Sequence, residues 1–434
     1  MSCHGIVENA WVQISVGRTA MARGRRLKIW LYTAITEQEQ FQPLARPALQ
    51  RAKSMVRHGL NRLSTRLTGR LHVDNFHYQV ANSLADNSNR GDIAIRVAVR
   101  QQFLAALAPR PVEFVELKWG DLTDQAVDRI NRECDLFIIA GGGYIFINGD
   151  GTGQPRLNDI PFLQKIECPV IAYGIGMNRL LHEEVCDLNN LPSATQSLVR
   201  GLRSACDDVG VRDAETLELM NLYGGGPSSL IGDPVLFMYN TFATEKNRAA
   251  VRRPLIGINF AGHGFHSQSM LKSLLPAAVE FLKHVQIKYG AAFIYLLHHD
   301  FEENVVAFLR QQGLRFDVVH SDLSQLFDSY RGLDFVICQM LHSCIFASNQ
   351  NTPFLNIAYD RKSVAFCDLL GVPQCALVHG DATVSALSAR FEELFAERDA
   401  IRRTLAAGKA PLNLAQREFV RRAAAFTESA VPSG

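Results

Sequence analysis

The feature that most constrains the fold is a regular alternation of short apolar runs, rich in strand-forming residues, with longer segments of helical spacing. Strands that alternate with helices of this length form βαβ units, so the pattern predicts an α/β fold with parallel sheets. The expected strands are residues 76–80, 112–117, 136–140, 170–174, 255–260, 293–298, 316–319, 335–338 and 354–357. The helices expected between them include residues 92–107, 123–132, 193–206 and 213–222.

A polar, charged stretch at residues 239–254 interrupts this alternation and is typical of a linker. A chain of 434 residues is also too long for one ordinary core, and its 47% apolar residues can fill two. We therefore expect two Rossmann-like domains that face each other across a cleft. The predicted divisions are a basic N-terminal extension at 1–72, an N-terminal domain at 73–240, a C-terminal domain at 254–395 and a helical segment at 396–434.

Composition excludes several classes of protein. The net charge of +2 creates no global field that would attract nucleic acid, so no nucleic-acid partner is expected. The nine cysteines form no CxxC motif and no paired spacing, which favours reduced thiols in a cytoplasmic protein. No apolar run approaches the roughly 18 residues needed to span a bilayer. The body of the protein is expected to be soluble and intracellular.

The N-terminal extension is strongly basic, with 12 Lys and Arg against 3 Asp and Glu in residues 1–70. Within residues 46–71, apolar side chains recur at helical spacing among arginines and lysines. Such a helix can lie on an anionic membrane surface, which would place the protein at the inner face of the cytoplasmic membrane. The alternatives are a helix packed on the body with a solvated basic face, or a partly disordered tail.

A strand–helix–strand unit at residues 334–362 carries the residues best suited to chemistry. His342 follows the first strand, and Arg361 and Lys362 follow the second. Because ligands of open α/β sheets bind outside the carboxyl ends of the strands, these residues are placed to hold and protonate an anionic substrate. The alternative for His342 is a buried core histidine at the start of a helix.

Four further clusters follow expected strands. They are a loop at residues 86–92 that includes Asn89 and Asp92, three glycines (Gly141, Gly142 and Gly143), Arg212 with Asp213, and Asp233. The first loop can present backbone N–H groups to an anion, and the glycines allow a ligand to approach the backbone closely. Each cluster also has a structural interpretation as a capped turn, a tight packing site or the start of the linker.

The remaining histidine clusters are less specific. His263 and His266 follow one expected strand, and His298, His299 and Asp300 end the next. A metal site needs about three to four ligands that converge in space, which spacing alone does not indicate here, so no metal is predicted. Contact with a sugar or phosphate is the preferred functional interpretation of His298.

Taken in order, these motifs resemble the polysaccharide pyruvyl transferase family over about residues 75–375. The resemblance implies a two-domain, glycosyltransferase B-like fold and transfer of a pyruvyl group from phosphoenolpyruvate to a saccharide. Phosphoenolpyruvate would be the donor substrate, and no further cofactor is implied. The acceptor would be a saccharide or lipid-linked oligosaccharide in exopolysaccharide or cell-envelope polysaccharide synthesis. The alternatives are a nucleotide-sugar glycosyltransferase of similar architecture and a non-catalytic member of a polysaccharide assembly complex.

The resemblance also implies roles for individual residues. His342 would act as the general acid, with Asp92 or Asp233 accepting the sugar proton or binding its hydroxyls. Arg212 and Lys362 would hold the anionic donor. Further substrate contacts are expected from Asn89, Gly141, Gly142, Gly143, His298 and Arg361.

Position 340 departs from the family pattern. The family usually has arginine immediately before the Leu-His pair, whereas this chain has Met340 before Leu341 and His342. Methionine cannot hold a carboxylate or phosphate, so neighbouring cations are expected to compensate, or else the chemistry has changed.

Overall fold

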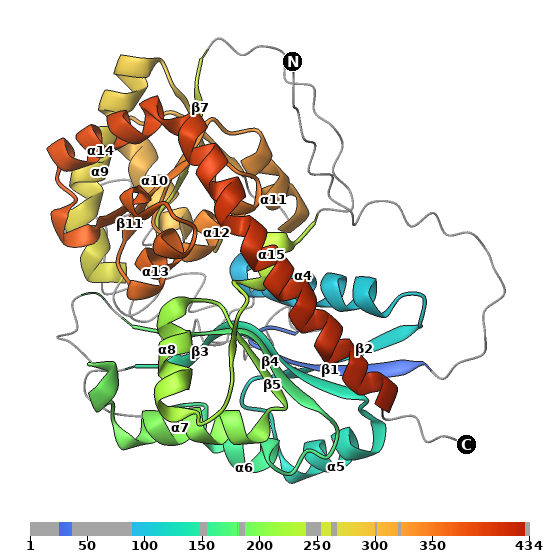
Figure 1. Ribbon diagram of the computed structural model, residues 1–434. Coiled ribbons are helices and arrows are strands. Elements are labelled where there is room, and N and C mark those ends of the chain that lie inside the picture. The colour runs from blue at the N-terminus through green and yellow to red at the C-terminus, as the bar shows by residue number, and fades with distance from the viewer. Residues whose placement is uncertain are drawn as a thin grey trace, which may run out of the picture.

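The protein is described by a computed structural model covering residues 26–36, 89–147, 154–179, 181, 187–239, 253–261, 267–299, 302–319 and 323–429. These parts form two α/β domains, each built on a six-stranded parallel sheet (Figure 1), which confirms the predicted fold class. Several expected features lie outside the described residues: the basic helix at 46–71, the strand at 76–80, residues 86–88, most of the 239–254 linker, and His263, His266 and Asp300.

The N-terminal sheet has the strand order β2-β1-β3-β4-β5-β6. Its strands are β1 (Leu27–Thr33), β2 (Val112–Lys118), β3 (Leu136–Phe146), β4 (Val170–Asn178), β5 (Asp208–Val211) and β6 (Ser229–Leu230). The helices are α4 (Arg90–Leu107), α5 (Asp124–Glu133), α6 (Ile160–Leu163), α7 (Ser193–Ala205) and α8 (Ala214–Tyr223). Because the strand order reverses between β1 and β3, the carboxyl ends of these strands mark a switch point where ligands of such sheets bind.

Strand β1 corrects the predicted domain boundary. Residues 1–72 are expected to form a separate extension, yet β1 pairs along its whole length with β2 and also with β3. Six of its seven residues are buried, and the remaining one, Lys28, is half-buried and pairs with Glu133 at 3.0 Å. A strand covered on both faces has a nearly continuous apolar sequence, which explains the run Leu27–Thr33. The N-terminal domain therefore begins near residue 27.

The C-terminal sheet repeats this design with the order β12-β11-β10-β7-β8-β9. Its strands are β7 (Leu255–Asn259), β8 (Ala292–Leu296), β9 (Phe316–Val319), β10 (Phe335–Cys338), β11 (Phe354–Ala358) and β12 (Ala376–Val378). The helices are α9 (Ser267–Tyr289), α10 (Glu303–Gln311), α11 (Leu323–Arg331), α12 (Leu341–Asn349), α13 (Arg361–Leu369) and α14 (Val384–Ala396). Here the order reverses between β7 and β10, so α12 starts beside the switch point.

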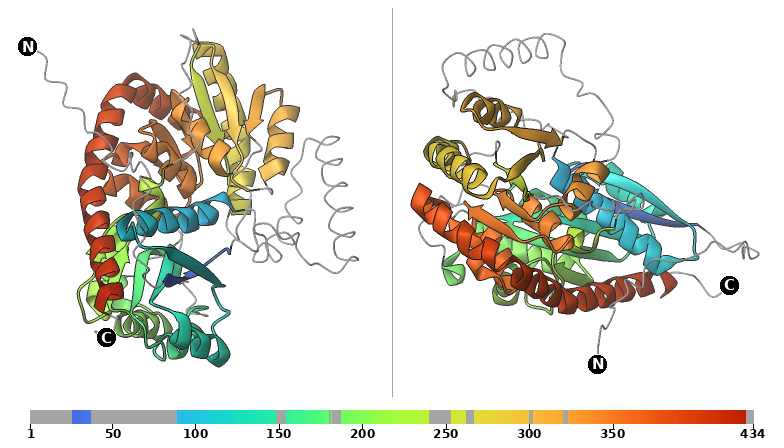
Figure 2. Two further views of the ribbon diagram at one scale, coloured as in Figure 1. Left: turned by 90° about the vertical axis from the view of Figure 1, so that its right-hand side faces the viewer. Right: turned by 90° about the horizontal axis from the view of Figure 1, so that it is seen from above.

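The last helix, α15 (Arg398–Ser429), begins in the C-terminal domain and crosses to the N-terminal domain, where it lies beside α4 (Figures 1 and 2). Lys409 donates to the last carbonyls of α12, those of Ser348 at 2.6 Å and Asn349 at 2.8 Å. Further along, the Phe419 ring stacks on Tyr173 of β4 with centroids 5.5 Å apart. Apolar residues of α4, α15 and the C-terminal sheet belong to one continuous core. Helix α15 therefore holds the two domains together.

Candidate active site

The two domains touch at the carboxyl ends of their strands. The Arg90 amide at the start of α4 donates to the His298 carbonyl at 3.0 Å. After β4 and β11, the Arg361 amide donates to the Arg179 carbonyl at 2.9 Å, and Leu181 donates to Tyr359 at 3.5 Å. These backbone bonds hold the ends of strands from both sheets together. Residues that are distant in the sequence therefore meet between the domains.

The first turn of α4 lies against His342. Asn89 caps this helix by accepting from the Gly91 amide at 3.0 Å, and its side-chain amide donates to Asp92 at 2.8 Å. A Cβ atom on Gly91 would overlap the His342 imidazole, so only glycine allows the ring to lie this close to the helix backbone. The imidazole of the C-terminal domain is thereby placed beside the capped N-terminus that carries Asp92.

Two carboxyl groups, that of half-buried Asp92 and that of buried Asp233, interact in this region. Burial raises the pKa of Asp92 to about 6, with Asp233 raising it further and Lys362 and Arg212 opposing the shift. Burial also raises the pKa of Asp233 to about 6, against the lowering effects of Arg212 and the Val235 amide. Desolvation disfavours the charged form, and the nearby cations only partly compensate. Asp92, Asp233, Arg212 and Lys362, all predicted site residues, therefore interact electrostatically with one another.

Arg212 is held rigidly at the end of β5. Its Nη2 donates to the Met177 carbonyl at 3.0 Å, and its Nε donates to Asp213 at 3.3 Å. The guanidinium group packs on Gly176, where a Cβ atom would overlap it. Asp213 in turn caps α8 by accepting from the Thr216 amide at 2.8 Å. The guanidinium is buried and its orientation is fixed by the backbone around it.

Lys362 connects the two domains. Its ammonium group lies 3.2 Å from Asp360, which caps α13, and donates to Asn178 at the end of β4 at 3.3 Å. Asn178 donates in turn to the Gly143 carbonyl at 2.9 Å. Asn178 is absent from the predicted site because the strand expected at residues 170–174 ends four residues before it. The observed β4 continues to Asn178 and places its amide at the domain boundary.

The three glycines differ from the predicted loop. They continue β3, whose pairing with β4 changes register between Gly142 and Ile145. Gly141 and Gly142 have φ values of 54° and 79°, in the left-handed region that favours glycine. A Cβ atom on Gly142 would lie 2.9 Å from the Trp119 ring. These glycines therefore allow close packing on the strand, and only Gly143 joins the polar chain to Lys362 through Asn178.

Arg361 is engaged by the opposite domain. Its Nε donates to Glu215 in the first turn of α8 at 2.9 Å, and a second nitrogen of the guanidinium contacts the same oxygen. Arg361 is expected to help hold an anionic substrate. In the structure its ion pair with Glu215 links α13 to α8 across the domain boundary. Its neighbour Lys362 is the cation of this pair that interacts electrostatically with Asp92.

His298 does not reach the domain boundary with its ring. The side chain is fully buried, packs 5.0 Å from the Phe346 ring, and lies 2.6 Å from the Tyr330 hydroxyl. That hydroxyl lies 2.7 Å from Ser343, the residue after His342. The His298 ring is expected to contact substrate. In the structure it instead belongs to a buried hydrogen-bonded chain, through Tyr330 and Ser343, that supports the first turn of α12. The backbone carbonyl of His298 accepts from the Arg90 amide of the N-terminal domain.

Met340 caps α12 without a side-chain hydrogen bond and is buried, with 4% of its surface exposed. Its amide donates to the Asn259 side chain at 3.4 Å. The preceding residue, Gln339, accepts from the Ala261 amide at 3.0 Å. The methionine therefore occupies a desolvated position, where a cation in its place would need an anionic partner.

Within the described ranges, no group of three or more His, Cys, Asp or Glu side chains is arranged to hold a metal ion. No helix among these residues combines the length and apolar character that crossing a membrane requires.

Known proteins resemble this chain in sequence pattern and in fold. A structure assigned as a UDP-N-acetylglucosamine 2-epimerase from Listeria monocytogenes has a TM-score of 0.52 and 11% identity, covering 78% of this chain and 95% of that one. MnaA of S. aureus, solved with UDP, has a TM-score of 0.50 and 9% identity, covering 76% and 92%. These likenesses show the glycosyltransferase B-like fold alone. The curated proteins gave no match. A model of the polysaccharide pyruvyl transferase family matches residues 89–361, more than half of the chain, and the protein therefore belongs to that family.

Proposed function

We propose that this protein transfers the pyruvyl group of phosphoenolpyruvate to a saccharide and forms a cyclic ketal on two hydroxyls. The observation that carries this conclusion is the junction between the domains, where His342 lies against the N-terminus of α4 that carries Asp92. Asp233, Arg212 and Lys362 interact electrostatically with that carboxyl. An acid, two carboxyl groups and two cations are the groups that this reaction requires.

His342 acts as the general acid in this mechanism. It donates a proton to the methylene carbon of phosphoenolpyruvate, which makes the adjacent carbon C2 electrophilic and oxocarbenium-like. A sugar hydroxyl forms a bond to C2 and the C2–O bond to phosphate breaks. A second hydroxyl then closes the ring, so that one phosphate is released for each ketal. An imidazole suits the first step because its pKa lies near neutral pH in ordinary surroundings.

The cations hold the donor. Arg212 uses Nε and Nη2 for bonds inside the protein, while Nη1 makes no hydrogen bond within the described residues. Lys362 adds a second positive charge from the other domain. A guanidinium and an ammonium that are already oriented can bind phosphate and carboxylate oxygens through charge-assisted hydrogen bonds. The donor thus lies between the domains, within reach of the His342 ring.

The two carboxyl groups complete the chemistry. With pKa values raised to about 6, Asp92 and Asp233 change protonation close to neutral pH. A group that titrates near the working pH can accept the proton of an attacking hydroxyl and return it later. Of the two, Asp92 is the base in this mechanism because Asn89 and the helix N-terminus fix its orientation.

The acceptor belongs to a cell-envelope polysaccharide or exopolysaccharide and is presented as a free or lipid-linked oligosaccharide. The charge pattern of residues 46–71, which lie outside the described residues, supports contact with an anionic membrane on the cytoplasmic side. Sedimentation with vesicles of phosphatidylglycerol should retain the protein at low salt, whereas vesicles of phosphatidylcholine should not. Equal sedimentation with both lipids would argue against an electrostatic membrane contact.

Turnover is tested by incubating the full chain with phosphoenolpyruvate and a panel of lipid-linked and nitrophenyl sugars. Phosphate release with a mass gain of one pyruvyl unit is the expected result. His342→Ala should lower turnover roughly 100-fold or more and leave donor affinity within a few-fold. Arg212→Ala should weaken donor binding instead. His284→Ala is the matched control, because that histidine lies on α9 in an exposed pair with Glu392.

Calorimetry separates the competing functions. Binding of phosphoenolpyruvate supports pyruvyl transfer, and wild-type rates in the His342→Ala variant would contradict the assigned acid. Binding of a nucleotide sugar without any response to phosphoenolpyruvate would identify a glycosyltransferase. If the protein binds neither donor and turns over no sugar, it is a non-catalytic member of an assembly complex.

A further inference from the structure

Three cations at the junction between the domains are already paired with carboxylates of the protein. The pairs are Arg212 with Asp213 at 3.3 Å, Lys362 with Asp360 at 3.2 Å, and Arg361 with Glu215. Asp92 and Asp233 add two further carboxyl groups in the same region. Phosphoenolpyruvate brings a phosphate and a carboxylate, so it adds negative charge where these positive charges are already balanced. A further cation at the junction would offset that charge.

Arg179 is such a cation. It follows Asn178, the last residue of β4, and therefore stands at the carboxyl edge of the N-terminal sheet. Its side chain is half-buried and makes no hydrogen bond, ion pair or ring contact within the described residues. The Arg179 guanidinium thus differs from the three paired cations, because no carboxylate of the described chain neutralises it.

The backbone fixes Arg179 beside the residues that hold the donor. Its carbonyl accepts from the Arg361 amide at 2.9 Å, at the start of α13. The preceding residue, Asn178, accepts from the Lys362 ammonium group at 3.3 Å. Arg179 therefore adjoins the partner of Lys362 in the sequence and contacts the neighbour of Lys362 in space.

Position 340 gives this cation a role. Met340 stands where the resemblance to the family leads us to expect an arginine, and it is buried. Arg361, which is expected to compensate, is engaged by Glu215. We propose that Arg179 binds an anionic group of phosphoenolpyruvate from the N-terminal domain, opposite Lys362 of the C-terminal domain. A guanidinium can hold phosphate or carboxylate oxygens through two parallel hydrogen bonds. This inference rests on the proposed function and adds a donor-binding residue to it.

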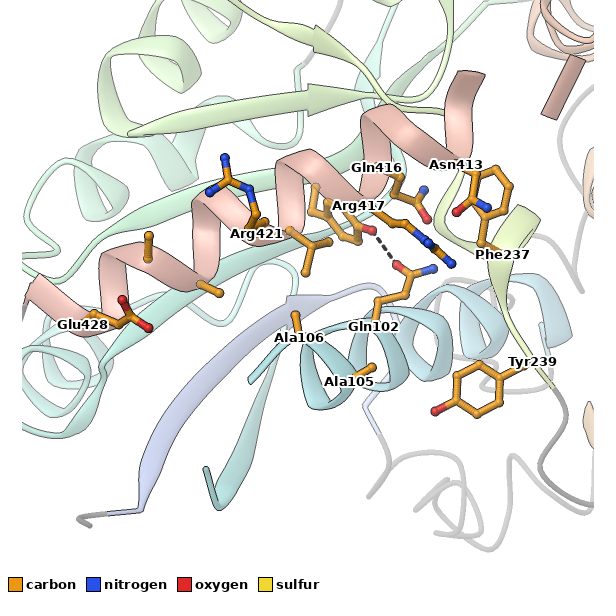
Figure 3. Close-up of a pocket in the computed structure, with 14 residues that line it drawn as sticks. Gln102, Ala105, Ala106, Phe237, Tyr239, Asn413, Gln416, Arg417, Arg421 and Glu428 are labelled. Atoms are coloured by element: carbon orange, nitrogen blue, oxygen red, sulfur yellow. Dashed lines mark hydrogen bonds between the residues drawn. The ribbon is translucent and has the colours of Figure 1, made fainter. Parts of the chain in front are cut away.

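A cavity remote from the junction provides a control arginine. It encloses about 530 Å³ between the last turns of α4, the chain after η3 (Pro234–Phe237) and the second half of α15 (Figure 3). Gln102 in its wall follows Asn89 at the junction by 13 positions, or about 20 Å along α4 at about 1.5 Å per residue. Arg421 also lines this cavity and pairs with Glu418 at 2.7 Å. With a Debye length of about 8 Å at physiological salt, its charge should have little effect at the junction.

The test is a calorimetric titration of the full chain with phosphoenolpyruvate. Arg179→Gln should weaken binding at least about tenfold, because a charge-assisted hydrogen bond is lost. Arg179→Lys should keep part of the affinity, since it retains the charge without the planar fork of donors. Arg421→Gln should bind like the wild type. Circular dichroism confirms that each variant is folded, and the backbone bond between Arg179 and Arg361 does not depend on the side chain.

Titrations with inorganic phosphate and with pyruvate identify the group that Arg179 holds. The one whose affinity falls in Arg179→Gln corresponds to the end of the donor that contacts the guanidinium. If phosphoenolpyruvate binds equally well to the wild type and to Arg179→Gln, the inference is overturned and the proposed function stands. The inference is also overturned if Arg179→Gln and Arg421→Gln weaken binding equally.

The opposite result is equally distinct. Binding of inorganic phosphate that depends on Arg179, without any binding of phosphoenolpyruvate, would overturn pyruvyl transfer and retain Arg179 as a phosphate-binding residue for another donor. If the wild type binds none of the three anions, both the proposed function and the role of Arg179 are overturned.

Discussion

Replacing Asp233 with asparagine should make the protein more stable at neutral pH. The Asp233 side chain is almost fully buried, and its Oδ1 accepts from the Val235 amide at 2.9 Å while its Oδ2 has no hydrogen-bond partner in the described part of the chain. Asparagine keeps the Oδ1 acceptor that caps η3 and removes the charge. The substitution therefore isolates the cost of burying an ionised carboxyl group.

The magnitude follows from the raised pKa. Folding shifts the pKa of Asp233 from 3.8 to about 6, so between these values the folded chain holds a proton that the unfolded chain has lost. The free energy of unfolding consequently falls as pH rises through this window and stays at its lower value above it. At 1.36 kcal/mol per pK unit, the wild type should lose about 2–3 kcal/mol relative to Asp233→Asn between pH 4 and 7.

Urea unfolding followed by tryptophan fluorescence measures this difference. Trp30 and Trp119 lie in the N-terminal domain, as Asp233 does, so their emission reports on the relevant domain. The control is Asp399→Asn, which removes an exposed carboxylate 3.0 Å from Arg402 and should change stability by less than about 1 kcal/mol at either pH. If the difference in unfolding free energy between Asp233→Asn and the wild type does not change with pH, the raised pKa of Asp233 is refuted.

Three further substitutions have defined outcomes. Lys409→Met removes the ammonium group that donates to the Ser348 and Asn349 carbonyls at the end of α12 and should lower the unfolding free energy by about 1–3 kcal/mol in urea titrations. Glu215→Gln breaks a partly exposed ion pair with Arg361 and should change stability by less than about 1 kcal/mol, with donor affinity in calorimetry altered only a few-fold. Met340→Arg should add little donor affinity, because Lys362 already supplies a cation; a gain of about 10- to 150-fold would show that no neighbouring cation had compensated.

Much of the fold was predictable because the sequence pattern is local. The runs at 316–319 and 335–338 form β9 and β10 at the predicted residues, and most of the other strands and helices predicted in the described ranges differ from the observed ones by a few residues at their ends. Strands β1, β5, β6 and β12 were not predicted. Buried parallel strands need apolar side chains on both faces, so each one gives a short apolar signal. The sequence positions of His342, Arg212 and Lys362 at strand ends follow from the same alternation.

Glycines explain two of the differences from the sequence prediction. Gly141 to Gly143 and Gly174 to Gly176 resemble the ends of strands because glycine weakens an isolated strand. In the structure both runs lie inside strands, and Gly174 and Gly176 have Pro234 and Arg212 directly against their backbones. Glycine is needed there because a Cβ atom would collide with a residue distant in the sequence. Such a requirement becomes visible only when the packing partner is known.

The roles of charged and polar side chains depend even more on tertiary contacts. Arg361 and Lys362 are adjacent in the sequence and both begin α13, so no local pattern distinguishes them. Their side chains nevertheless have different partners, because Glu215 on α8 accepts from Arg361. Lys362 instead meets Asn178 and the electrostatic field of Asp92. The sequence locates the edge of the sheet where a site forms, whereas the domain interface decides which of the two neighbouring cations interacts with Asp92.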